Sequence, residues 1–411
     1  MNKQSIYKFS ENTLSLFSIK AVELGLTIWL IPYLILKVGL ANYGRYAFAM
    51  AFILFFVNVL NYGFNLSTVR ELVKNKNNPA KINALFNEVI SVKLVLFGAL
   101  YLFVLGLIVL IPEFWAHKQL YFYTSLLLVG EFFSLRWFFM GMEQMKFKSF
   151  INLSSTFIYI LLLLLFIQVD DDYIYIPLYE AIAVISVSIS AFFWVVKKHQ
   201  MTLKILSFKE ISHYLKVNFS SFINLLLPST YGTIIVFLVG LLGVPTYVSF
   251  MQIGVKFTGA FGTANTVITK VCYPLVNRNE KLRGVTSLLL LSIGVVLSIS
   301  MYVSAPFLLS NWLHFEHATQ LAETIFMVQL LSPIPFLMGV VSSYGINGLL
   351  TFYKDILYLK ITVIATLAML LMAGLLIPPY HFYGGAIALL VGRFVYAGLA
   401  WYSFKKVKRH V

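Results

Sequence analysis

The sequence predicts an all-α polytopic membrane protein, with twelve transmembrane helices in two six-helix lobes around a central cavity and both termini cytoplasmic. Three observations predict this class: an apolar composition, long segments without charge, and basic residues confined to alternate loops. Of the 411 residues, 60% are apolar and only 11% are charged. This composition excludes an ordinary soluble domain.

The apolar segments are long enough to cross a bilayer as helices. Asp, Glu, Lys and Arg are absent from 46–69, 149–169, 217–255, 284–315, 324–353 and 361–392. A helix rises about 1.5 Å per residue and needs roughly 20 apolar residues to cross the hydrocarbon core. The strands of a membrane barrel would alternate apolar and polar residues, which these segments do not. We therefore expect helical spans at 14–36, 44–65, 84–111, 119–140, 150–169, 173–196, 219–242, 247–269, 285–308, 324–349, 356–377 and 382–403.

The basic residues predict the orientation of these spans. The termini and the loops after the even-numbered spans hold most of the 31 Lys and Arg residues, whereas the opposite loops contain Lys37, Arg45 and Lys118. Cytoplasmic loops are enriched in Lys and Arg, so both termini are expected in the cytoplasm. The net charge of +15 belongs to these loops and forms no continuous basic face, so no nucleic-acid partner is expected.

The longest basic connection, 197–218, divides the chain into an N-terminal lobe (1–196) and a C-terminal lobe (219–411). Its sequence fits two descriptions, a partly amphipathic segment on the inner membrane surface or a solvated linker. A G-x-x-x-Y pattern follows the first span at 39–43 and the seventh at 243–247. The repetition of this pattern favours two parallel six-span repeats with a cavity between them.

The tenth span contains strong helix breakers. Pro333 and Pro335 are followed by Gly339, Gly345 and Gly348. Proline lacks a backbone N–H and clashes with the preceding turn, so this span should be broken or bent.

The candidate substrate-binding residues are cations inside or at the ends of the spans. A charge within a span costs at least about 2.5–3.5 kcal/mol on insertion scales, so it usually faces a wet cavity or an ionic partner. We interpret these residues as a cationic cavity for an anionic head group, in particular a phosphate. Structural pairing between spans is the alternative interpretation. The residues are Lys93, Lys256, Arg393, Lys20, Arg45 and Arg136.

Acidic residues within the spans are candidates for ion coupling. These are Glu23, Glu131 and Glu180, each of which has buried ion pairing as its alternative role. Lys20 and Glu23 lie one helical turn apart and are well placed to neutralise each other. Glu131 and Arg136 are five residues apart, a spacing less suited to pairing on one helix.

The sequence contains no catalytic constellation, so the chain is not expected to be an enzyme. The short, basic first outside loop presents no carboxylate for glycosyl transfer, and no outside loop has the size typical of a polysaccharide polymerase. Cys272 is the only cysteine, which excludes an intrachain disulfide and a multi-cysteine metal site. We expect neither a cofactor nor a bound metal.

The chain resembles the Wzx-type polysaccharide flippases of the multidrug/oligosaccharidyl-lipid/polysaccharide exporter (MOP) superfamily. Two segments carry the resemblance, YGFNLSTVREL at Tyr62–Leu72 and WFFMGMEQMKFKS at Trp137–Ser149. The second segment has Met140 where a glutamine is common in the family. The expected topology agrees with the family over the whole chain.

This resemblance implies a role in O-antigen and lipopolysaccharide biosynthesis. The implied activity is translocation of an undecaprenyl-pyrophosphate-linked oligosaccharide to the outer leaflet of the bacterial inner membrane by alternating access. The expected partners are this substrate, membrane lipid, and the polysaccharide polymerase and chain-length machinery. Two alternatives stay open, a MATE-like cation-coupled drug antiporter and a membrane polysaccharide polymerase or glycosyltransferase.

Overall fold

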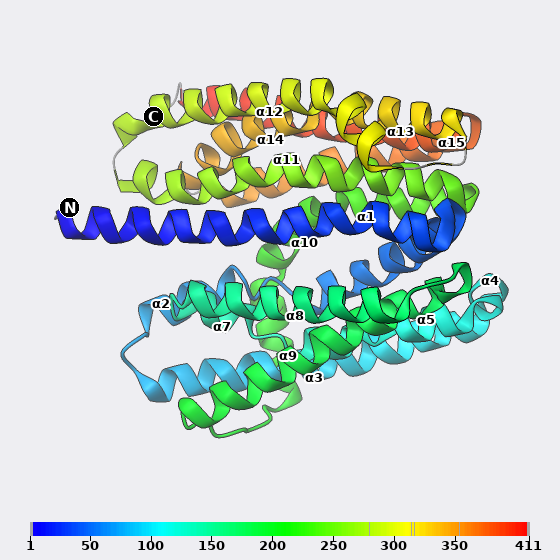
Figure 1. The fold of residues 1–411 in the computed structure, drawn as a ribbon. Coiled ribbons are helices and arrows are strands. Elements are labelled where there is room, and N and C mark those ends of the chain that lie inside the picture. Colours follow the sequence, from blue (N-terminus) through cyan, green and yellow to red (C-terminus); the bar gives the residue numbers. More distant parts are fainter. Residues whose placement is uncertain (1–2, 279, 314, 316, 353, 409–411) are drawn as a thin grey trace. The chain divides into compact units, whose positions relative to one another are not determined.

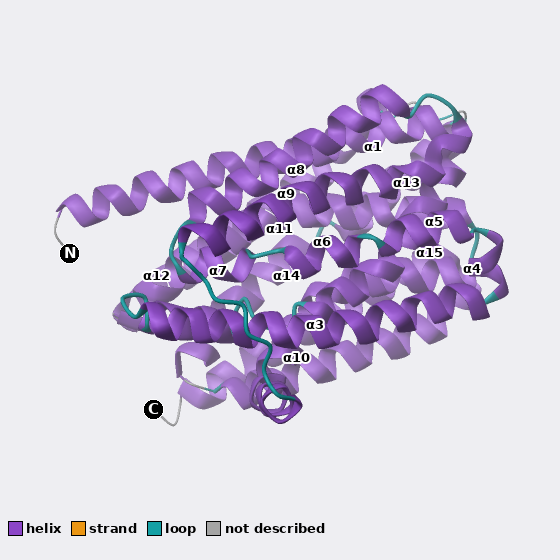
Figure 2. Ribbon diagram, turned by 90° about the horizontal axis from the view of Figure 1, so that it is seen from below, coloured by secondary structure: helices purple, strands orange, loops and turns teal. Residues whose placement is uncertain are grey.

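The computed structural model describes residues 3–278, 280–313, 315, 317–352 and 354–408, with side chains except at 3–21, 23, 24, 27, 28, 274, 275, 277 and 278. The described chain is helical with short loops and no strand, as predicted (Figure 1 and Figure 2). Its elements are α1 (Lys3–Leu60), α2 (Ser67–Lys74), α3 (Pro79–Leu110), α4 (Pro112–Ala116), α5 (Lys118–Ser125), α6 (Leu127–Phe133), α7 (Arg136–Gly141), α8 (Met145–Phe166), η1 (Asp170–Tyr175), α9 (Ile176–Lys198), α10 (Phe208–Leu242), α11 (Pro245–Arg278), η2 (Glu280–Leu282), α12 (Arg283–Trp312), α13 (Ala318–Leu331), α14 (Ile334–Val340), η3 (Val341–Ile346), η4 (Leu349–Phe352) and α15 (Asp355–Lys408).

Within the described chain, eight helical segments are long and apolar enough to cross a membrane. They are Trp29–Leu60, Pro79–Leu110, Met145–Phe166, Asp170–Lys198, Phe208–Leu242, Glu280–Trp312, Ala318–Phe352 and Asp355–Lys408. Large apolar side chains on them, such as Leu102, Phe157 and Phe307, are more than half exposed, as lipid-facing residues are. The protein is therefore a multi-pass membrane protein.

The two longest helices are each interrupted by one residue with non-helical geometry. Gly39 (φ 75°, ψ 160°) interrupts α1 between the first and second predicted spans. His381 (φ 51°, ψ −126°) interrupts α15 between the eleventh and twelfth. A positive φ is readily adopted by glycine, which has no Cβ, and rarely by other residues. Each of these long helices therefore consists of two helices that meet at a sharp change of direction.

The fourth predicted span, 119–140, is not a continuous helix. α5, α6 and α7 replace it, and the chain is extended at Ser134 (ψ 123°) between α6 and α7. The prediction failed here because the break is stabilised by a lysine of a distant helix and not by a proline or glycine at the break itself.

The break predicted in the tenth span is confirmed. α13 ends at Leu331 and α14 begins at Ile334, with Pro335 in its first turn. The wider π-helical turn η3 follows directly. This span is therefore segmented where its prolines lie.

Contacts between Cα atoms divide the chain into two compact units. The first comprises Met1–Glu23 and Ala49–Thr230, and the second comprises Leu24–Phe48 and Tyr231–Val411. Within the second unit, Ser249 donates a hydrogen bond to the carbonyl oxygen of Leu40 at 2.6 Å, which joins the break in α1 to α11. The six-span lobes expected from the sequence stay a prediction.

The first unit has an aromatic core. Phe86 of α3 packs against Trp137 and Phe138 of α7, with ring centroids 5.9 and 6.0 Å apart. Tyr62 stacks on Phe222 of α10 at 4.4 Å. These buried rings fix the ends of several helices around one region of the unit.

The connection between α9 and α10 lies along α3. The backbone N–H groups of Thr202, Lys204 and Leu206 donate to side-chain oxygens of Asn83, Asn87 and Ser91, each at 3.0 Å. Two residues of extended chain advance about 6.6 Å, close to the roughly 6 Å of four helical residues, so the two periods match. The sequence suggested a membrane-surface segment or a solvated linker at 197–218, and neither description includes this arrangement. The first part of the segment is bound to α3, and residues 208–218 are the start of α10.

Candidate functional site

A cavity of about 280 Å³ lies inside the first unit. The end of α1 and the helices α6 to α9 line it, and Leu54, Val57 and Phe139 give it apolar surface. Its polar lining residues are Asn58, Asn61, Glu131, Ser134, Arg136, Lys148, Asn152, Ser155, Glu180 and Ser188. A concave site with a few converging polar groups is the usual form of a binding site.

Glu131 and Arg136 form an ion pair at this cavity, so the expectation that their spacing disfavours pairing is wrong. The chain unwinds between α6 and α7, which turns Arg136 back toward the buried Glu131 carboxylate. Arg136 Nε also donates to Ser134 Oγ at 3.1 Å. The Glu131 side chain is 5% exposed and that of Arg136 is 41% exposed. The guanidinium therefore reaches the cavity while its partner is enclosed.

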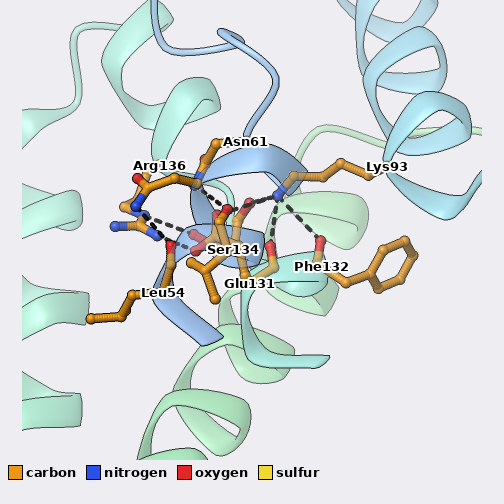
Figure 3. Close-up of polar contacts among 9 residues, drawn as sticks. Leu54, Asn61, Lys93, Glu131, Phe132, Ser134 and Arg136 are labelled. Atoms are coloured by element: carbon orange, nitrogen blue, oxygen red, sulfur yellow. Dashed lines mark hydrogen bonds and ion pairs between the residues drawn. The ribbon is translucent and has the colours of Figure 1, made fainter. Parts of the chain in front are cut away.

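Lys93 of α3 binds the broken end of α6 from the other side (Figure 3). Its Nζ donates to the carbonyl oxygens of Glu131 at 2.7 Å, Ser134 at 2.8 Å and Phe132 at 3.4 Å. Nζ also lies 3.8 Å from Glu131 Oε1. The last carbonyls of a helix lack partners within it and carry partial negative charge. Lys93, which has no exposed surface, therefore caps the break and is not among the residues that line the cavity.

The charged lining of the cavity is balanced. Glu131 and Glu180 supply two carboxylates, and Arg136 and Lys148 supply two cations. Lys148 Nζ lies 3.4 Å from the sulfur of Met140, the position at which the second family segment departs from its pattern. The lining therefore carries no formal net charge, and the cationic cavity expected between the two lobes stays a prediction.

Several cavity residues are absent from the candidates derived from the sequence. Lys148 belongs to α8, which begins at Met145, so it is part of a helix and not of the loop expected at 141–149. The spacing of Lys148, Asn152 and Ser155 places them on one helical face, and Asn61, directly after α1, follows Asn58 by the same helical spacing of three residues. A search for polar residues at helical spacing would have found both sets.

Three of the other predicted cations, Arg45, Lys256 and Arg393, belong to the second unit. Arg393 of α15 lies over the buried ring of Tyr231, with its guanidinium carbon 4.8 Å from the ring centroid. Tyr231 in turn accepts a hydrogen bond from Thr366 Oγ1 at 3.0 Å. Within the described part of the chain, no carboxylate forms an ion pair with Arg393. The guanidinium is thus held by an aromatic face and not by a neutralising acid.

The remaining candidates are dispersed. Arg45 donates to the side chain of Asn42, and Lys256 is a half-buried residue of α11. Lys20 and Glu23 lie outside the residues whose side chains are described. The structure therefore brings Lys93, Glu131, Arg136 and Glu180 together in one unit, and places Arg45, Lys256 and Arg393 in the other.

Solved transporter structures share this fold. An inward closed structure of the lipid II flippase MurJ has a TM-score of 0.74 and 14% identity, covering 95% of this chain and 87% of that one. An inward-facing multidrug resistance MATE family transporter of the MOP superfamily has a TM-score of 0.67 and 15% identity, covering 93% of this chain and 94% of that one. At these identities the likeness concerns the fold alone.

Comparison with known sequences identifies the family, which the shared fold alone does not. The chain is 26% identical over 377 residues to a putative O-antigen transporter of Escherichia coli (strain K12), covering 87% of this chain and 88% of that protein. A family model described as polysaccharide biosynthesis protein matches residues 9–280, which include both segments that carry the resemblance noted above. Since this match spans more than half of the chain, the chain belongs to the polysaccharide biosynthesis protein family.

Proposed function

We propose that this protein is a flippase that moves an undecaprenyl-pyrophosphate-linked oligosaccharide, an O-antigen or related repeat unit, to the outer leaflet of the bacterial inner membrane. The observation that carries the proposal is the nearly full-length match with a putative O-antigen transporter. The fold supports it, because a lipid II flippase has the same fold. The activity is transport and needs no catalytic group.

The proposed membrane arrangement has twelve spans, with both termini in the cytoplasm and six-span lobes at 1–196 and 219–411. The breaks at Gly39 and His381 support this number, because α1 and α15 then supply two spans each. Alternating access would expose the head group first to the cytoplasm and then to the outside, while the polyprenyl chain stays in lipid.

In this proposal, cations of the spans hold the pyrophosphate. Arg393 is the best supported of them, because Tyr231 positions its guanidinium and no described carboxylate competes for it. A planar guanidinium binds phosphate through two parallel hydrogen bonds. Lys256, Arg45 and Lys20 are proposed to add positive charge, while Lys93 and Arg136 shape the cavity of the first unit.

The test is complementation of a bacterial strain that lacks its own O-antigen flippase and makes a repeat unit matched to this protein. Surface polysaccharide is scored as a ladder on a gel. Restored ladders would support the proposal. Absent ladders, despite normal amounts of the protein in the membrane, would contradict it.

A second candidate function is a cation-coupled drug antiporter. The observation that favours it is the presence of Glu131 and Glu180 at one cavity, since coupling to cations requires carboxylates. Saturable efflux of a cationic dye from vesicles containing the purified protein, driven by a proton or sodium gradient, would support this candidate over the flippase.

A further inference from the structure

We propose that the cavity of the first unit is a subsite for one neutral sugar ring of the transported oligosaccharide. This inference rests on the proposed flippase function. The ring binds among Asn58, Glu131, Arg136 and Asn152.

The charge balance of the cavity argues against a phosphate ligand. Arg136 is already paired with Glu131, and Glu180 adds a second carboxylate to the lining of the same cavity. A phosphate would have to compete with Glu131 for Arg136 and would also meet the negative charge of Glu180. A sugar hydroxyl, in contrast, both donates and accepts hydrogen bonds, so it suits a lining that offers donors and acceptors together.

Two asparagines at the end of α1, Asn58 in its last turn and Asn61 directly after it, supply acceptors at the cavity wall. Asn58 and Asn61 each donate through Nδ2 to a carbonyl one turn earlier, those of Leu54 at 2.8 Å and Val57 at 3.2 Å. These bonds fix the amide orientation. The amide oxygen of each side chain retains capacity to accept a hydrogen bond, as a ring hydroxyl can provide.

Glu131 supplies a buried acceptor that lacks a hydrogen-bond donor. Its Oε2 binds Arg136, whereas Oε1 accepts no hydrogen bond from a described residue and has the Lys93 ammonium at 3.8 Å. The residue is only 4% exposed and lines the cavity, so this oxygen is held in place. A buried acceptor without a donor is costly, and a ligand hydroxyl would satisfy it with a strong, charge-assisted bond.

The size of the cavity selects a small group. At about 280 Å³ it lies just below the range of about 300–1,000 Å³ typical of pockets for drug-sized ligands. It therefore suits a single ring and not a complete repeat unit. Leu54, Val57 and Phe139 offer apolar surface to the C–H face of such a ring.

Binding of neutral monosaccharides to the purified full-length protein tests this inference. The probes are D-glucose, D-galactose, N-acetyl-D-glucosamine and L-rhamnose, each followed by saturation-transfer NMR in detergent. Inorganic phosphate, followed by broadening of its ³¹P line, is the anionic comparison. We expect at least one sugar to bind, and Asn58→Ala and Asn152→Ala each to weaken it about fivefold, the effect of one lost hydrogen bond.

Asn311→Ala is the matched control. Asn311 lies on α12 outside the cavity and makes the same local bond as Asn58, to the carbonyl oxygen of Phe307 at 2.7 Å. This variant should bind sugar as the unchanged protein does. Absence of sugar binding, binding of phosphate alone, or equal binding by all three variants would overturn the inference.

The complementation test separates this inference from the function on which it rests. Restored ladders without sugar binding would reject the subsite and leave the flippase intact. Sugar binding that depends on Asn58 and Asn152, with no ladders in the matched strain, would support a sugar site in this cavity and reject the flippase.

Discussion

The buried and half-buried cations of this protein differ in what surrounds them. Lys93 is enclosed by three backbone carbonyls and lies beside a carboxylate, so its charge is used within the protein. Arg393 rests on an aromatic ring without a described acidic partner, which is the reason we propose it as a ligand of the pyrophosphate. The sequence identified both residues as charges within predicted spans. The difference between their surroundings depends on neighbours that are distant in the chain.

Replacing Lys93 tests its structural role. Lys93→Met should lower the free energy of unfolding by about 1.5–3 kcal/mol, because the buried carbonyls at the end of α6 lose the ammonium that binds them, while Glu131 keeps its pair with Arg136. Chemical unfolding in mixed micelles measures this loss. Lys405→Met is the control, since Lys405 is exposed and its Nζ contacts only the Trp401 ring, at 3.9 Å, among the contacts described, so its loss should stay below about 1 kcal/mol. Equal stability of the two variants would contradict the capping role.

Replacing Arg393 tests its role in transport. Arg393→Ala should abolish surface polysaccharide in the complementation strain, because the proposed pyrophosphate contact is lost. Arg393→Lys should restore only part of the ladder, because an ammonium keeps the charge but loses the planar fork and its stacking on Tyr231. Immunoblots of membranes control for the amount of protein. A normal ladder with Arg393→Ala would reject the contact.

At the scale of elements, three kinds of helix break occur, and the sequence predicts two of them. Gly39 and the prolines of the tenth span are local signals, because backbone freedom and a missing N–H act at the residue itself. The break at Ser134 has no such signal, since it depends on Lys93, 41 residues away in sequence. The ion pair and cavity that follow from this break could not be derived from spacing alone.

The break at Gly39 leads to a stability prediction. A Cβ at this position would meet no atom within 4 Å, so Gly39→Ala adds only the backbone cost of a conformation that is nearly restricted to glycine, about 1–3 kcal/mol. Gly374→Ala is the matched control, because Gly374 is an exposed residue of α15 with the same open surroundings and a helical backbone. That variant should gain roughly 0.5–1 kcal/mol. Unfolding in mixed micelles should therefore shift in opposite directions for the two variants, and a shared direction would contradict this explanation.

At the scale of the whole molecule, composition and charge placement predicted the class correctly. Both depend on the bilayer as solvent, which constrains every residue of a span in the same way. The grouping of residues 24–48 with the C-terminal part of the chain could not be predicted, because it depends on packing contacts such as Ser249 with Leu40. The family was evident from two short segments, whereas the cavity needed the structure.

The predicted orientation is testable because the chain has one cysteine. In a Cys272→Ala background, Lys118→Cys should react with a membrane-impermeant maleimide in intact spheroplasts, since its loop is expected outside. Lys76→Cys should react only after permeabilisation, since its basic loop is expected in the cytoplasm. Both positions are exposed, so access to the side chain is not limiting. The reverse pattern would invert the topology.

The connection that lies along α3 has a consequence for how this chain can change in length. Its N–H groups bind at every second residue, to side chains at every fourth residue of the helix. One inserted residue would turn the following N–H groups away from Asn87 and Ser91, whereas two would restore their direction. Although it has no regular secondary structure, this segment has the two-residue repeat of a β-strand, in which alternate N–H groups point in the same direction. Insertions and deletions are therefore admissible there only in pairs of residues.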